Sequence, residues 1–109
     1  MKREDFLCLA ERELHGMLTV IKQKNHDYTG ADDDALANFK ITEKLGLSDA
    51  RTGLLIRMVD KIQRLRTYIA KGQLQVPGEG AKDAARDCIG YSLLLIAMLE
   101  EQEAPYERP

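Results

Sequence analysis

Two neighbouring rows of charged residues are the part of this sequence that could do chemistry. The first row is acidic: Glu79, Asp83 and Asp87 recur at steps of four, and Tyr91 follows one step later. Residues four apart share one face of a helix, so three carboxylates would line up along about two turns. Like charges at this spacing repel each other unless a cation lies among them. The row therefore predicts that a cation lies beside it, either a metal ion or basic side chains.

The second row is basic and lies earlier in the chain. Arg57, Lys61 and Arg64, with Asp60 beside them, form one polar stripe of another helix. Oxygen ligands alone favour Mg²⁺ or Mn²⁺ over zinc, because hard cations prefer carboxylate and water. Mg²⁺ commonly links carboxylates to substrate phosphates, and Arg and Lys bind phosphates directly. Acids beside bases on antiparallel helices thus suggest a site for a metal ion and a polyphosphate.

An ion-pair network between helices would use the same residues without any ligand. Asp60 would then pair with Arg64, and Asp83 would pair with Arg86 or Lys82. Spacing alone leaves this structural explanation and the metal–polyphosphate site both open.

Composition restricts the class of protein. The chain has 109 residues, a net charge of −2, 44% hydrophobic and 31% charged residues, which predicts a single soluble domain over residues 1–109. The mild negative charge gives no reason to expect bulk nucleic-acid binding. No apolar run is long enough for a membrane span and no secretion signal is recognisable, so we expect no membrane association and a cytoplasmic location. Cys8 and Cys88 are expected to be small buried apolar side chains in a reducing compartment.

Hydrophobic residues recur at helical spacing in four stretches, and no stretch alternates as a strand does. The expected helices cover residues 4–24, 34–45, 49–71 and 79–103, and residues 105–109 are expected to fray. The fold class is therefore all-α, a four-helix bundle-like domain.

Local signals predict where these helices begin and end. Turn residues 25–30 are expected to end the first helix, and the acids Asp32 to Asp34 to cap the second. Gly46 is the expected stop of the second helix, and Ser48 the expected N-cap of the third.

Apolar residues predict how the two long helices pack. The third helix carries a near-heptad packing edge at Leu55, Met58, Ile62, Leu65 and Ile69. The fourth helix is apolar on nearly every side from Leu93 to Met98. A helix that is apolar all round is buried, so we expect a partner subunit to cover part of it.

Four sequence blocks carry a resemblance to a known family. They read K-x-K-N-H-D-Y, A-L-A-N-F, R-x-x-D-K-I-x-R-L and G-E-G-A-K-D-A-A-R-D-C-I-G-Y, in this order. Over about residues 18–100 the chain resembles the nucleotide-modification-associated domains of phage and bacterial proteins. These look like relatives of the all-α NTP pyrophosphatases, the MazG-like and dimeric dUTPase group.

The resemblance implies a homodimer or homotetramer that binds a nucleotide through Mg²⁺ (or Mn²⁺) and cleaves between the α and β phosphates. The metal ligands that it implies are Asp60, Glu79, Asp83 and Asp87. The catalytic residues would be Asp60, Lys61 and Arg64, with the two cations stabilising charge on the phosphates. The nucleotide pocket would comprise Lys24, Asp27, Tyr28, Asn38, Phe39, Arg57, Lys61, Arg64 and Tyr91.

Two positions depart from the family's pattern of E-x-x-E followed by E-x-x-D. Asp60 and Asp87 stand for the last acid of each motif, but Arg57 and Ala84 lie where the first acids belong. Glu79 or Asp83 could substitute for a missing carboxylate. The departures bring catalysis into question more than nucleotide binding.

Three functions therefore follow from the sequence. The first is a Mg²⁺-dependent nucleoside triphosphate pyrophosphohydrolase of nucleotide metabolism or pool cleansing, in the cytoplasm of a bacterial or phage-infected cell. The second is a non-catalytic protein that sequesters or senses a modified or signalling nucleotide. The third is a helical module with an ion-pair network and no ligand.

Overall fold

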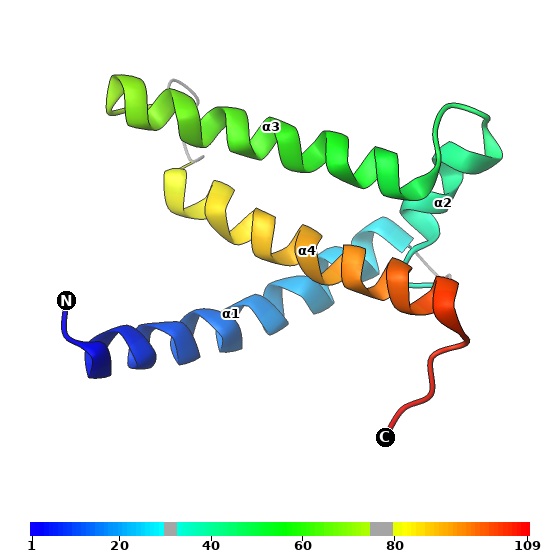
Figure 1. Cartoon of the computed structure of the whole chain (residues 1–109), viewed down its shortest axis with the longest axis horizontal. Coiled ribbons are helices and arrows are strands. Elements are labelled where there is room, and N and C mark those ends of the chain that lie inside the picture. Colours follow the sequence, from blue (N-terminus) through cyan, green and yellow to red (C-terminus); the bar gives the residue numbers. More distant parts are fainter. Residues whose placement is uncertain (30–32, 75–79) are drawn as a thin grey trace. The chain divides into compact units, whose positions relative to one another are not determined.

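The computed structural model describes residues 1–29, 33–74 and 80–109, except for the side chains of residues 28 and 29, and it is all-helical over these ranges (Figure 1). Its elements are α1 (Arg3–Thr29), α2 (Ala37–Lys44), α3 (Ala50–Lys71) and α4 (Ala81–Glu103). The all-α prediction is therefore confirmed. The chain forms two compact units, Met1–Ala35 and Leu36–Pro109, and each is described by itself. Within the described ranges, none of the helices is long and apolar enough to cross a bilayer.

The first unit consists mainly of α1, which is longer than predicted. The helix continues through five of the expected turn residues and reaches Thr29. Asn, His and Asp disfavour a helix only weakly, so tertiary context overrides them at small cost. Asn25 shows such a context, because its Nδ2 donates a 2.9 Å hydrogen bond to the carbonyl of Ala35. Cys8 on this helix is exposed, which corrects the prediction that it is buried.

The second unit begins with α2, whose start lies three residues later than predicted. α2 starts at Ala37, and Leu36 occupies its N-cap position without a side-chain hydrogen bond. The N-cap position is therefore occupied by Leu36 and not by Asp33 or Asp34, and Asp32 lies outside the described residues. The Leu36 side chain is buried, so apolar packing fixes this end of the helix. The predicted stop is confirmed, since Gly46 has the left-handed φ of +71° that favours glycine after a helix.

Asp49, and not Ser48, caps α3. Its Oδ1 accepts hydrogen bonds from the backbone N–H groups of Arg51 (3.0 Å) and Thr52 (3.1 Å), and its Oδ2 accepts one from the Thr52 hydroxyl (2.7 Å). The Ala50 N–H donates to Glu43 Oε1 at 2.7 Å, so α2 satisfies a further donor of this helix end. These bonds fix the junction between α2 and α3.

The Asp49 cap predicts an acid-sensitive contribution to stability. Hydrogen bonds from the Thr52 hydroxyl and N–H, with the charge of Arg51, hold the pKa of Asp49 below its usual range. A depressed folded-state pKa means that this stabilisation is complete above the unfolded pKa of about 3.9 and is lost as pH falls through the folded value. Asp49→Asn keeps an N-cap but cannot ionise, so its free energy of unfolding should depend less on pH below about pH 4. Urea unfolding at several acidic pH values measures this, and equal pH dependence in both proteins would contradict it.

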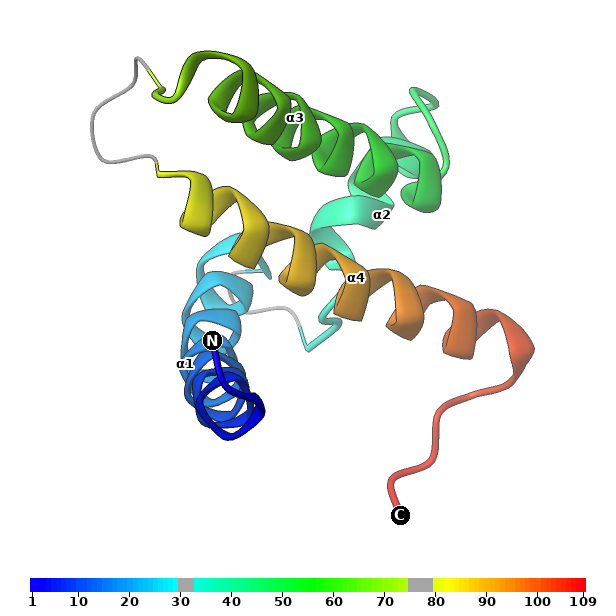
Figure 2. The same ribbon diagram turned by 60° about the vertical axis from the view of Figure 1, so that its left-hand side comes forward.

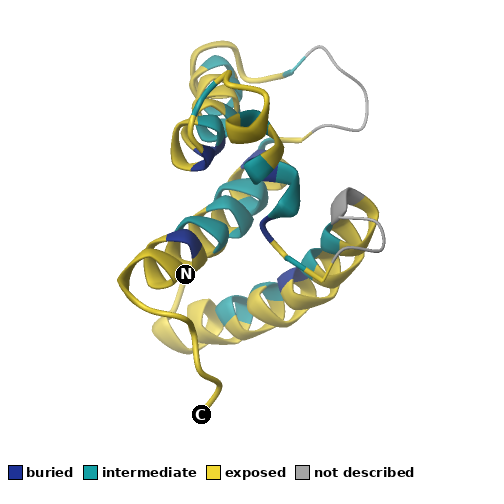
Figure 3. Cartoon of the chain, turned by 90° about the vertical axis from the view of Figure 1, so that its right-hand side faces the viewer, coloured by how far each residue is buried: buried dark blue, intermediate teal, exposed yellow. Residues whose placement is uncertain are grey.

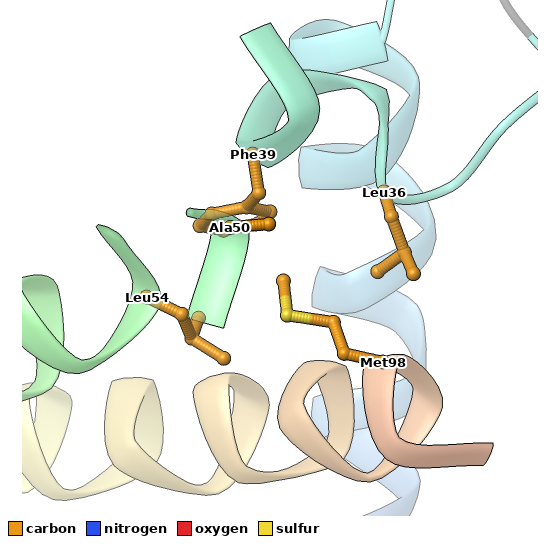
Figure 4. Packing of buried hydrophobic residues seen from close by; sticks show 5 residues of the cluster. All are labelled: Leu36, Phe39, Ala50, Leu54 and Met98. Atoms are coloured by element: carbon orange, nitrogen blue, oxygen red, sulfur yellow. The ribbon is translucent and has the colours of Figure 1, made fainter. Parts of the chain in front are cut away.

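α3 and α4 form an antiparallel hairpin, and α2 packs on α3 at one end of it (Figures 1 and 2). A core cluster fills this end, made by Leu36, Phe39, Ala50, Leu54 and Met98 (Figure 4). Leu54 is fully buried, at 0% exposure. α4 begins at Ala81 with Gly80 as its N-cap, two residues later than predicted. Residues 104–109 form no regular helix or strand, as expected for a frayed tail.

The predicted packing edge of α3 is only partly right. Met58 and Leu65 are half-buried, but Leu55, Ile62 and Ile69 are 49%, 47% and 83% exposed. The contact with α4 instead centres on a line that includes Leu54, about 100° away around the helix from Leu55. Exposed residues accordingly run along the faces of α3 and α4 that point away from their contact (Figure 3).

Candidate functional site

The basic row of α3 forms the centre of the candidate site. Arg57, Lys61 and Arg64 are all half-buried, which places them at the margin of the contact with α4. The fourth member of the predicted stripe, Asp60, is exposed. The structure therefore keeps the three cations together and turns the acid between them outward.

An ion pair joins this row to α4. Lys61 Nζ lies 2.9 Å from Asp87 Oδ2, and the two side chains are only 19% and 21% exposed. Charges this far removed from water are screened less than surface charges, so they interact more strongly but also cost desolvation energy. The predicted cationic and acidic rows thus meet at Lys61 and Asp87.

Arg57 marks the end of the row nearest α2. Its guanidinium carbon lies 4.8 Å from the centroid of the Phe39 ring, within the range of a cation–π contact. Phe39 is 5% exposed and belongs to the core cluster. The structure thus makes Phe39 a packing residue that holds Arg57, where the sequence suggested a stacking surface for a base.

The acids of α4 are neutralised by basic neighbours. Asp83 Oδ1 accepts a 3.0 Å hydrogen bond from Arg86 Nη1, as the ion-pair explanation predicted, whereas the pair of Asp87 with Lys61 was not among its predicted pairs. Among the residues that the structure describes, no three His, Cys, Asp or Glu side chains form a group that could hold a metal ion. Glu79 lies outside those residues, so the predicted set of four carboxylates stays a prediction.

These charged residues share one side of the hairpin. At about 100° per residue, Arg57, Asp60 and Arg64 lie about 60–120° around α3 from Leu54, the residue that faces α4. Asp83 and Asp87 lie about 60–100° around α4 from Ala84, in the same rotational sense. Because α3 and α4 are antiparallel, equal rotations about their axes point to the same side of the hairpin. We call this side the polar side and define it by Arg57, Asp60, Arg64, Asp83 and Asp87. The contacts of Arg57 with Phe39 and of Lys40 with Glu101 place α2 on this side too.

The remaining predicted pocket residues fall in three places. Asn38 on α2 and Tyr91 on α4 are half-buried, and Tyr91 packs against the core cluster. Lys24 and Asp27 lie on α1, in the other unit of the chain. The side chain of Tyr28 lies outside the described part of the chain.

One cavity of the second unit was not predicted from the sequence. A cavity of about 250 Å³ lies between α2, the start of α3 and the end of α4. Its Lys40 Nζ is 2.8 Å from Glu101 Oε1, and its Arg51 Nη1 donates to Gln102 Oε1 at 3.5 Å. These partners are far apart in the chain, so no local pattern could have joined them.

Comparison with protein-family models, with curated proteins and with solved structures found no match to this chain. The resemblance to all-α NTP pyrophosphatases therefore stays a prediction from the four sequence blocks. The helical fold agrees with that resemblance at the level of fold class.

Proposed function

We propose that the polar side of the α3–α4 hairpin binds the phosphate groups of a nucleotide. The observation that carries this proposal is the row of Arg57, Lys61 and Arg64, held half-buried beside α4 in a chain of net charge −2. Guanidinium and ammonium groups form charge-assisted hydrogen bonds with phosphate oxygens. Partial burial strengthens these bonds, because water screens them less than it screens surface charges.

Asp87 would regulate the availability of Lys61. In the structure their ion pair neutralises the centre of the row, so a phosphate must compete with the Asp87 carboxylate for Lys61. Asp60, Asp83 and Asp87 are the described carboxylates on the polar side, and they do not converge as a group of three. A Mg²⁺ or Mn²⁺ ion would bind one of them, such as Asp87, together with the phosphates, and would neutralise charge between carboxylate and phosphate. Nucleotide binding should therefore be stronger with a divalent cation than without it.

Hydrolysis of the bound nucleotide is the second candidate function. It is favoured by the location of these acids and cations on one side of the hairpin. In such a Mg²⁺-dependent pyrophosphohydrolase, Lys61 and Arg64 would stabilise charge that develops on the phosphates.

The two departures from the family pattern, Ala84 and Arg57, favour binding without hydrolysis. Ala84, where an acid belongs, is 4% exposed and packed into the hairpin, so no carboxylate is offered from that position. Arg57, where the other acid belongs, contacts Phe39. A protein of either kind would act on nucleotides of the cytoplasm.

A comparison of two arginines on α3 tests the binding proposal. With a nucleoside triphosphate and Mg²⁺, the wild-type Tm should rise, because a ligand that binds only the folded state stabilises it. Arg64→Ala should weaken binding by roughly 10- to 100-fold, the worth of about 1.5–3 kcal/mol for a hydrogen bond to a charged group. Arg66→Ala should leave binding unchanged, since Arg66 is exposed away from the polar side and donates to Gln63.

Calorimetric titration gives the dissociation constants for this comparison. Far-UV circular dichroism of each variant confirms that the helices are retained. If the two variants lost the same affinity, or if triphosphate stabilised the wild type no more than an equal concentration of sodium sulfate did, the proposal would be wrong.

A further inference from the structure

The cavity between α2, the start of α3 and the end of α4, which we call the junction cavity, lies close to the row of cations. Its lining residue Ala50 is seven positions before Arg57, which corresponds to about 10 Å along the helix axis. Its lining residues Lys40 and Glu101 form the ion pair that joins α2 to α4 on the polar side. The sugar and phosphate chain of an extended nucleotide spans such a gap. A base in the junction cavity would therefore leave its phosphates beside Arg57 and Lys61.

The size and the apolar lining of the junction cavity suit one base. Its volume of about 250 Å³ is below the roughly 300–1,000 Å³ of sites that enclose a whole drug-sized ligand. Leu36 and Met98 line it and are only 3% and 5% exposed (Figure 4). The thioether of methionine makes favourable contacts with aromatic rings. These two side chains thus offer a ring the apolar contact that Phe39, packed in the core, does not offer.

Carboxylates outnumber cations around the junction cavity. Its ionisable lining residues are two bases and three acids: Lys40, Arg51, Glu43, Asp49 and Glu101. Lys40 pairs with Glu101 at 2.8 Å, and Arg51 Nε lies 3.6 Å from Asp49 Oδ1. Glu43 is the third acid, and its Oε1 accepts a hydrogen bond from the backbone N–H of Ala50. The cavity therefore has an excess of hydrogen-bond acceptors, which favours a ligand rich in N–H donors.

Guanine is the common base with the most N–H donors. It carries N1–H and N2–H₂ side by side, which match the two oxygens of a carboxylate, and it presents O6 and N7 as acceptors, for which arginine is the commonest partner. Glu43 supplies a carboxylate and Arg51 a guanidinium. The contacts of Arg51 with Gln102 (3.5 Å) and Asp49 (3.6 Å) are long, so an incoming acceptor replaces them at little cost.

We propose that the junction cavity binds a guanine base, so that the ligand of the polar side is a guanine nucleotide. Glu43 accepts hydrogen bonds from N1–H and N2–H₂, and Arg51 donates to O6 and N7. The inference rests on the proposed function, because the phosphates of the same ligand occupy the row of Arg57, Lys61 and Arg64. Glu43 and Arg51 are then residues that determine base specificity.

Calorimetric titration with α,β-methylene triphosphates of guanine, adenine, cytosine and uracil tests this base preference. These compounds resist cleavage between the α and β phosphates, so binding is measured alone. With Mg²⁺, the wild type should bind the guanine compound roughly 10- to 100-fold more tightly than the others, the range for one good bidentate contact to a base. Glu43→Gln keeps an acceptor for the Ala50 N–H but loses the carboxylate, so most of the preference should disappear. Glu100→Gln, exposed on α4 and outside the cavity lining, should retain it.

Inorganic tripolyphosphate separates failure of this inference from failure of the proposed function. It has phosphates but no base, so wild type and Glu43→Gln should bind it with equal dissociation constants. In ¹⁵N-resolved NMR spectra, the backbone amides of residues 40–51 and 98–102 should shift more with the guanine compound than with tripolyphosphate. Equal affinity for all four bases, or no shift of these amides, would overturn the guanine site while bound tripolyphosphate upholds the phosphate site. No binding of tripolyphosphate or of any nucleotide would overturn both.

Discussion

Leu54→Ala is expected to lower the free energy of unfolding by about 2–5 kcal/mol, the range for truncating a buried leucine. Leu54 is the fully buried side chain at the contact of α2, α3 and α4, with Phe39 and Met98 in the same cluster (Figure 4). Its removal leaves a cavity where helix backbones prevent collapse. A small domain has only about 5–15 kcal/mol of stability, so the loss is a large fraction of the total.

Leu47→Ala is the control for this prediction. Leu47 is 75% exposed in the turn before α3, so the same substitution there should change stability by only about 0.5 kcal/mol. Urea unfolding followed by circular dichroism, at one protein concentration throughout, gives both values. Equal losses at the two sites would show that Leu54 is not a core residue.

Asp87→Ala is expected to destabilise the hairpin by about 1–3 kcal/mol, because it removes the carboxylate 2.9 Å from the largely buried Lys61 ammonium. Lys61→Met combined with Asp87→Ala should recover much of that loss, since neither charge then remains to be desolvated. A double-mutant cycle measured by urea unfolding gives the coupling energy. A cycle with no coupling would mean that the pair contributes nothing to the fold.

The same substitution separates the two candidate functions. A panel of NTPs and dNTPs with Mg²⁺ or Mn²⁺ is assayed for nucleoside monophosphate and pyrophosphate. A pyrophosphohydrolase would release both products, and Asp87→Ala would abolish the release because a carboxylate at the metal is lost. A binding protein would release neither, and Asp87→Ala would still be stabilised by triphosphate, because Lys61 is then available to the phosphates. Product release by the wild type would therefore replace the binding proposal with the hydrolase.

The sequence by itself determined the helices and the face of α3 that carries the three cations. Hydrophobic periodicity predicted the four helices, and no strand, that the structure has over its described residues, and Gly46 and Gly72 ended α2 and α3, each with a positive φ. The spacing of Arg57, Lys61 and Arg64 kept the three cations on one face of α3. These features depend on residues within a few positions of each other, which is the range over which helical periodicity and capping act.

The tertiary structure alone decided how those helices are turned and joined. α3 has two apolar stripes, and packing against α4 and α2 selected the one with Leu54 while leaving Leu55, Ile62 and Ile69 outward. The ion pair of Lys61 with Asp87 joins residues on different helices. Asp49, and not Ser48, is the N-cap of α3. Glu43 of α2 accepts a further hydrogen bond from the start of this helix, at the Ala50 N–H. The rotation of a helix about its axis is set by the free energy of burying one stripe against distant residues, and the local sequence does not encode that choice.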